Sequence, residues 1–213
     1  MAVAAFREVR LSRAGRTVLD GATWTLEAGA FHLLTGPSGC GKSAWLALCA
    51  LRLRPEAGEV SLFGAPAAGV GGEAAAGLRR RIGWAPQVPE FLEHMSLAEN
   101  VALPLRLAGR PPALRLAQAR ELLDWIGLGA RSADLPGALS AGERRRAALA
   151  RAVIAGPELI LADEPAGDLD PEGAERSLQV LAALASLAAA VLATTQSAEF
   201  ARLARHRAEA RVL

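Results

Sequence analysis

The chain has few of the residues that mark exported, disulfide-linked or nucleic-acid-binding proteins. Of its 213 residues two are cysteine and none is tyrosine, and the formal net charge is only +2. Cys40 and Cys49 fall in and just after a glycine-rich loop where no disulfide is expected, so they indicate a reducing, cytosolic compartment. A charge this close to neutral gives no general attraction to nucleic acid, and we therefore expect no nucleic-acid partner.

Signals for export or membrane insertion are also missing. The chain reaches Arg7 and Glu8 within its first eight residues, so it lacks the basic and then apolar pattern of a signal peptide. The longest uncharged run, residues 177–198, is long enough to span a bilayer. Because it is mostly alanine, it is better divided into a helix from Pro171 to about Leu187 and a buried strand from Ala190 to Thr194. We expect a protein that is soluble unless it is tethered to another.

What remains is the composition of a single globular domain. Hydrophobic residues make up 52% of the chain and charged residues 22%. This length suffices for one well-buried domain, or for one core with a small inserted lobe. We expect residues 1–213 to form one domain.

The clearest motif fits the phosphate-binding pattern G-x-x-x-x-G-K-[ST]. Its glycines let the backbone wrap closely around an anion, its lysine adds a positive charge, and its serine offers a hydroxyl to Mg²⁺. A buried strand, Phe31–Thr35, precedes it and a helix, Lys42–Leu51, follows it, as this loop requires. Turn glycines alone would not explain that coincidence. We expect ATP and Mg²⁺ to bind here, at Gly36, Pro37, Ser38, Gly39, Cys40, Gly41, Lys42 and Ser43.

Two adjacent carboxylates end a second buried strand. Leu159–Ala162 is an unbroken apolar run, as in a central parallel strand, and Asp163 and Glu164 follow it. In a phosphate-loop enzyme the first acid is oriented towards Mg²⁺ and the second polarises the attacking water. The alternative is that they cap a helix or a turn.

Further strands and loops surround these motifs. Phe6–Ser12 and Val18–Leu26 alternate apolar and polar residues and predict an antiparallel pair, and Glu59–Phe63 predicts another strand. The glycine- and alanine-rich residues 65–77 predict a surface loop.

Two basic stretches flank predicted structure. The triplet Arg79–Arg81, before a strand Ile82–Ala85, is either a patch for nucleic acid or acidic lipid or a solvated helix end, and we favour the helix end. The basic run 202–211 predicts a solvated surface.

Helical patterns occupy much of the second half. Ser96 and Ser140 each open a capping box with a glutamate three residues on. Helices are predicted through Leu103, over Pro112–Ile126 and over Arg144–Ala155, which suggests an inserted helical lobe at about residues 90–156. Asp170, before a proline, and Ser197 predict two further N-caps, the second for a short helix to about Leu203.

With its motifs in this order the chain resembles the ATP-binding subunits of ABC transporters over essentially its whole length. Gly36–Ser43 matches the Walker A loop, Gln87 the Q-loop glutamine, Leu139–Glu143 the signature, Leu159–Glu164 the Walker B strand and Asp170 the D-loop. The resemblance implies an α/β fold: a P-loop NTPase core with an antiparallel β subdomain and an inserted helical lobe.

The resemblance also implies roles for residues. The catalytic residues would be Glu164, Gln87 and the residue after the last long strand, here Thr195. Mg²⁺ would be held by Ser43, Gln87 and Asp163. Two chains would dimerise head to tail on ATP, and the further nucleotide-binding residues would be Ala44, Arg13, Ser140, Gly142, Glu143 and Asp170.

Among subfamilies, residues 31–39, 99–105 and 163–170 look most like FtsE, the cell-division ATPase that pairs with the membrane protein FtsX. This predicts an FtsX-like transmembrane partner and a peripheral place on the cytoplasmic face of the plasma membrane. The alternatives are a lipoprotein-release or export subunit, and a degenerate module that binds nucleotide, hydrolyses it weakly and regulates a membrane complex.

Four departures from the family pattern predict slow turnover more than weak binding. Thr195 stands where the family has a histidine for the γ-phosphate, and Ala44 where it has a threonine. Ala141 replaces the first signature glycine, where a positive φ would be costly. Arg13 occupies the place of the aromatic residue that stacks on adenine, although a guanidinium can also stack on a ring.

Overall fold

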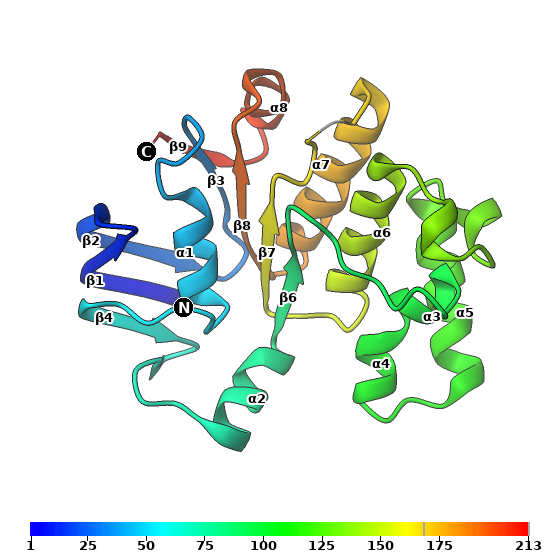
Figure 1. Ribbon diagram of the computed structural model, residues 1–213, viewed down its shortest axis with the longest axis horizontal. Coiled ribbons are helices and arrows are strands. Elements are labelled where there is room, and N and C mark those ends of the chain that lie inside the picture. The colour runs from blue at the N-terminus through cyan, green and yellow to red at the C-terminus, as the bar shows by residue number, and fades with distance from the viewer. Residues whose placement is uncertain (168, 213) are drawn as a thin grey trace.

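Two β-sheets enclose one helix, and further helices cover the outer face of the larger sheet (Figure 1). The computed structural model describes residues 1–167 and 169–212. Asp168, which belongs to the motif at residues 163–170, lies outside the described residues. The architecture is the α/β fold that the sequence predicted, with a core of helices and a parallel sheet, and a separate antiparallel sheet.

The smaller sheet has the strand order β2-β1-β4-β5 and is antiparallel. Its strands are β1 (Ala2–Arg13), β2 (Arg16–Glu27), β4 (Ala57–Leu62) and β5 (Ala65–Pro66). Helix α1 (Lys42–Cys49) packs on it through Trp45, whose ring centroid lies 4.6 Å from that of Phe6 and 5.5 Å from that of Trp24. The predicted hairpin is confirmed, with longer strands than the alternation indicated.

The larger sheet is parallel and has the order β6-β7-β8-β3-β9. Its strands are β6 (Ile82–Ala85), β7 (Leu159–Asp163), β8 (Ala190–Thr195), β3 (Phe31–Thr35) and β9 (Glu209–Val212). Leu159 and Leu161 pack with α1, whereas Ile160 and Ala162 pack with the helices on the opposite face. Strand β7 is therefore buried on both sides, which explains its unbroken apolar sequence.

The remaining helices gather mostly on that opposite face (Figure 1). Both predicted capping boxes are present, at Ser96 and Ser140. The predicted helix through Leu103 is in fact two short helices. The bounds are α2 (Gly72–Arg80), α3 (Leu97–Val101), α4 (Leu103–Leu107), α5 (Pro112–Trp125), α6 (Ala141–Val153), α7 (Pro171–Ser186) and α8 (Ala198–Ala204), with 3₁₀ turns at Gly129–Arg131 and Pro136–Ala138. The lobe at about residues 90–156, which contains α3 to α6, stays a prediction.

One predicted loop contains a helix, and one predicted solvated surface contains a strand. The expected loop at residues 65–77 contains most of α2, because alanine favours a helix, Ala75 is buried, and Glu73 pairs with Arg80. The solvated surface predicted at residues 202–211 is mostly exposed, as expected, and it also contains the start of β9, which hydrogen-bonds to β3. All four β9 residues are exposed, so no apolar alternation marked the strand. The solvated helix end at Arg79–Arg81 is partly right: Arg79 and Arg80 are exposed at the end of α2, and Arg81 forms an ion pair with Glu158.

The long uncharged run divides as predicted, into the end of α7, the buried strand β8 and the start of α8. Within the described part of the chain, the search for membrane-spanning helices found none with sufficient length and apolar character.

Candidate functional site

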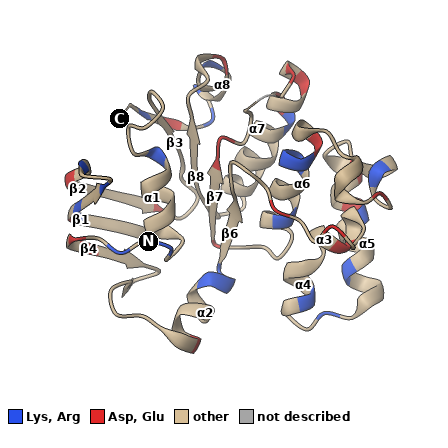
Figure 2. Cartoon of the chain, viewed as in Figure 1, with Lys and Arg blue, Asp and Glu red and all other residues tan. Residues whose placement is uncertain are grey.

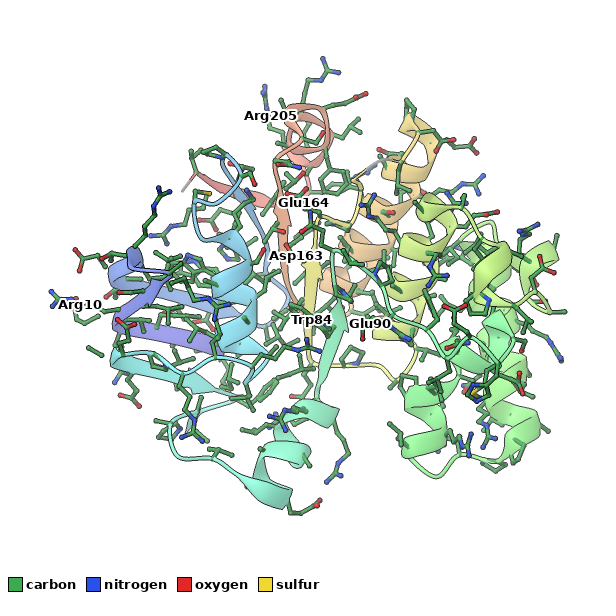
Figure 3. The ribbon with its side chains drawn as sticks, in the orientation of Figure 1. Arg10, Trp84, Glu90, Asp163, Glu164 and Arg205 are labelled. Atoms are coloured by element: carbon green, nitrogen blue, oxygen red, sulfur yellow. The ribbon has the colours of Figure 1, made fainter. Side chains whose placement is uncertain are left out.

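A cavity of about 420 Å³ lies where the carboxyl ends of three parallel strands meet the glycine-rich loop. Asp163 and Glu164 follow β7 and Gln87 follows β6, while the loop joins β3 to α1. Figure 3 shows the two acids at the end of β7, with Trp84 on β6 beside them. The lining residues are Arg13, Val18, Ser38, Gly39, Gly41, Lys42, Ser43, Ala44, Ala47, Arg52, Leu53, Trp84, Gln87, Asp163, Glu164 and Gln196.

The loop has a backbone that only glycine adopts readily. Gly39 and Gly41 have φ angles of 82° and 101°. A Cβ on Gly41 would lie 2.5 Å from Cγ1 of Val18, so the loop is also packed tightly against β2. Lys42 is buried and its Nζ donates to the carbonyl oxygens of Gly36 at 2.7 Å and Pro37 at 2.9 Å. The only lysine of the chain is thus held inside the loop, where it can neutralise a phosphate.

The two carboxylates are buried and are held by the neighbouring strand. Thr194 Oγ1 donates to Asp163 Oδ1 at 2.6 Å and accepts from the Glu164 backbone N–H at 3.1 Å. The backbone N–H of Gln196 donates to Glu164 Oε2 at 3.1 Å. Both acids are therefore fixed by hydrogen bonds from the end of β8.

The oxygen groups that line the cavity suit a hard cation. Ser43, Gln87 and Asp163 offer a hydroxyl, an amide and a carboxylate there. No group of three or more His, Cys, Asp or Glu side chains suited to a metal occurs among residues 1–167 and 169–212. Mg²⁺ that arrives with a nucleotide needs no such cluster, because phosphates and water complete its coordination. The residues present thus fit Mg²⁺ bound together with a nucleotide.

The opposite end of the cavity is less polar. Val18, Ala44, Ala47 and Leu53 form part of its wall, and exposed Arg13 stands at the end of β1. Arg13 is the planar group of this lining, and a guanidinium can stack on a flat ring.

Most of the predicted site residues meet at this cavity, but Thr195 does not. Thr195 is buried, its Oγ1 accepts from the Ser197 N–H at 3.0 Å, and it lines a neighbouring cavity of about 440 Å³ under α8. Gly36, Pro37 and Gln196 line that second cavity as well. The hydrogen bond to the Glu164 carboxylate comes from the backbone N–H of Gln196, and the catalytic role of Thr195 stays a prediction.

The signature residues are absent from both cavities and have local roles. Ser140 and Glu143 cap α6 reciprocally, and the Ser140 backbone N–H lowers the pKa of the Glu143 carboxyl. Ala141 is the first residue of α6 and is not among the residues with positive φ, so the predicted backbone cost is wrong. Asp170 accepts from the Gly173 N–H at 2.8 Å as the N-cap of α7.

Sequence reasoning missed some residues of the site. Val18 and Trp84 line the cavity, but an apolar residue on a strand gives no sign of this. Thr194 could have been recognised as a residue that needs a partner, though not which partner, since it is a polar residue in a buried apolar strand. A side chain of that kind needs hydrogen-bond partners nearby.

Residues 19–167 match the sequence profile described as ABC transporter. The chain is 43% identical over 159 residues to the lipoprotein-releasing system ATP-binding protein LolD of Paramagnetospirillum magneticum, a match that covers 74% of this chain and 70% of that protein. It is 44% identical over 167 residues to LolD 1 of Rhodospirillum rubrum, covering 77% and 73%. The fold matches the dimeric ATP-binding cassette MJ0796, in a post-hydrolysis state bound to ADP and Pi, with a TM-score of 0.86 and 27% identity over 94% of this chain and 90% of that one.

Proposed function

The chain belongs to the ABC transporter family, and from this premise we propose that it is the ATP-binding subunit of a lipoprotein-releasing membrane complex. The family's reaction is ATP hydrolysis, so the chain is an ATPase. The observation that carries the finer proposal is the identity of 43% and 44% to two LolD proteins. The sequence-based preference for FtsE and an FtsX-like partner receives no support from these relatives, which favour the lipoprotein-release alternative instead.

The cavity supports a division of roles among its residues. The loop amides and Lys42 bind the β- and γ-phosphates, and Ser43, Gln87 and Asp163 hold Mg²⁺ beside them. Bound Mg²⁺ supplies positive charge that neutralises the phosphate oxygens. Glu164 orients and polarises the attacking water, and the backbone N–H of Gln196 keeps the Glu164 carboxylate in place.

The site becomes complete with a second copy of the chain. Ser140 and Gly142, at the start of α6, lie outside the cavity of their own chain, and we expect them to reach the nucleotide held by the partner. The dimeric form of the matching cassette supports this arrangement.

A separate groove supports contact with a membrane partner. A cavity of about 700 Å³ lies between α2, β6, α4 and α6, and Leu107 on its rim is 83% exposed. Arg79, Arg80 and Arg151 line it; Figure 2 shows the basic residues of α2 and α6 in blue. An amphipathic segment of the partner with acidic residues would match this apolar floor and its basic edge.

The decisive experiment is purification of the chain from detergent-solubilised membranes, followed by reconstitution with the membrane protein that accompanies it. We expect a lipoprotein-releasing partner, ATP-dependent release of lipoprotein from vesicles, and loss of both with Leu107→Asp. Leu187→Asp serves as the control, because Leu187 is 80% exposed and does not line the groove. An FtsX-like partner without release would contradict the proposal.

The degenerate-module alternative has one observation in its favour, the threonine at position 195. It predicts ATP binding without turnover, even with the membrane partner present. Turnover by the reconstituted complex that Glu164→Gln abolishes would exclude it.

A further inference from the structure

We propose that Thr194 is a positioning residue of the ATPase site. Its one hydroxyl orients both Asp163, the proposed Mg²⁺ ligand, and Glu164, the residue proposed to polarise the attacking water. The inference rests on the roles proposed above for the two acids. It adds a residue of β8 that does not line the cavity.

The hydroxyl has one arrangement that satisfies both of its partners. Thr194 is completely buried and lies opposite Asp163 in the register of β7 and β8. Its single proton goes to Asp163 Oδ1 at 2.6 Å, and its oxygen accepts the Glu164 N–H at 3.1 Å. A hydroxyl-to-carboxylate bond of this length is among the strong, charge-assisted kind.

The hydrogen bond from Thr194 restricts rotation of the Asp163 carboxylate about χ2. The χ2 angle of aspartate is broad and roughly two-fold, so an unheld carboxylate can rotate. With Oδ1 held by Thr194, the carboxylate plane is set and Oδ2 keeps a fixed direction. Outer partners of this kind orient metal ligands, and their loss typically lowers metal affinity or activity by about 10- to 100-fold.

For Glu164 the bond supports an uncommon backbone conformation. Its φ of 49° is in the left-handed region, which is unfavourable for a residue with a Cβ. The hydroxyl of Thr194 accepts a hydrogen bond from the Glu164 backbone N–H, and the backbone N–H of Gln196 donates to Glu164 Oε2. The end of β8 and the residue after it therefore hold Glu164 at both its backbone and its carboxylate. The end of β8 thereby sets the position of the proposed water-polarising group.

The test compares Thr194→Val, which keeps the shape and removes the hydroxyl, with Thr194→Ser, which keeps the hydroxyl. The control is Thr35→Val at the end of β3, whose hydroxyl donates to the Arg211 carbonyl at 3.4 Å and which lines the second cavity but not the cavity of the two acids. Three quantities are measured: affinity for a fluorescent ATP analogue without Mg²⁺, the Mg²⁺ concentration that gives half of the Mg²⁺-induced thermal shift with ATP, and kcat and KM.

For Thr194→Val we expect Mg²⁺-free affinity within about twofold of the parent, a half-maximal Mg²⁺ concentration raised about tenfold, and kcat lowered about 10- to 100-fold. For Thr194→Ser and Thr35→Val, all three quantities should stay within about threefold of those of the parent. If the valine variant does not fold, Thr194→Ala takes its place, and serine must restore what alanine loses.

Folded Thr194→Val with the parent's Mg²⁺ dependence and kcat would overturn the proposal, as would equal losses with serine and valine. Failure of the parent chain to bind ATP would instead refute the proposed function, and this inference with it. The Mg²⁺-free affinity of the parent distinguishes the two failures.

Discussion

At the scale of single residues, Lys42 supplies the positively charged side chain of the phosphate loop. It is the only lysine in 213 residues, and it is 6% exposed and bonded to two carbonyls of its own loop. Its charge is therefore held in place before a phosphate binds. Lys42→Ala should weaken ATP binding by about tenfold or more, which isothermal titration would measure. Arg120→Ala, an exposed change on α5, is the control. An unchanged affinity in Lys42→Ala would remove the loop from the site.

The two cysteines differ enough to be told apart by alkylation. Cys49 is completely buried, and burial raises the pKa of its thiol to about 12. Cys40 is partly exposed, and its Sγ lies 3.8 Å from Lys42 Nζ. We expect rapid labelling of Cys40 alone and protection by ATP, as measured by mass spectrometry of the labelled peptides. The Cys40→Ser variant should show no rapid labelling. Equal labelling of both thiols would contradict the position of the loop.

Thr195 stands where the sequence comparison with the family led us to expect a histidine. Threonine is shorter than histidine and can donate only one hydrogen bond, so we expect slow turnover with near-normal ATP affinity. Thr195→His should raise kcat by up to about 10²-fold if it supplies the missing donor, whereas Thr195→Val should give no gain. Steady-state phosphate release measures both. Brisk turnover by the parent that histidine does not improve would assign the role to Gln196.

At the scale of elements, β9 pairs with β3 beside a buried histidine. His32 is 7% exposed and lies opposite Glu209, with Nε2 3.7 Å from its Oε2. Burial lowers the pKa of His32 from 6.5, opposed by Glu209 and assisted by Arg211. Because the folded chain resists protonation of this imidazole, its contribution to stability is complete above about pH 6.5 and is lost as the pH falls below that value.

The measurement is the urea concentration at which half of the chains are unfolded, at pH 8 and at pH 5.5. We expect the parent to lose more stability on acidification than His32→Gln, which has no proton to take up. The exposed His206→Gln should behave as the parent does. An equal loss of stability on acidification in all three chains would show that protonation of His32 does not cause it.

At the scale of the whole molecule, the proposal that two copies share the nucleotide predicts a dimer that forms on ATP. Glu164→Gln should bind ATP and not hydrolyse it, so the dimer should accumulate, since the group that polarises water is gone while the phosphate contacts remain. Light scattering with saturating Mg·ATP would show the mass double. Adding Ser140→Arg should prevent the doubling by filling the space where the signature meets the partner's nucleotide. A variant that stays monomeric under these conditions would indicate that the dimer needs its membrane partner.

The sequence by itself determined the phosphate loop, the acidic strand end, the two capping boxes and the mixed α/β architecture. Each of these is a local pattern: the glycines of residues 36–41 permit the loop, the apolar run before Asp163 requires a buried strand, and Ser140 with Glu143 closes its own helix start. Such features depend on residues a few positions apart, so they can be recognised without the fold.

Only the tertiary structure decided which residues support the two acids and which stretches form the sheet edge. Thr194 is 31 residues from Asp163, and the Gln196 amide is 32 from the carboxylate that it holds, so the register of β7 and β8 had to be known first. Strand β9 has four exposed residues and exists through its backbone pairing with β3, 177 residues earlier at His32 and Glu209. Backbone hydrogen bonds between distant strands leave no mark on side-chain pattern, and this is the physical reason that the sequence could not show them.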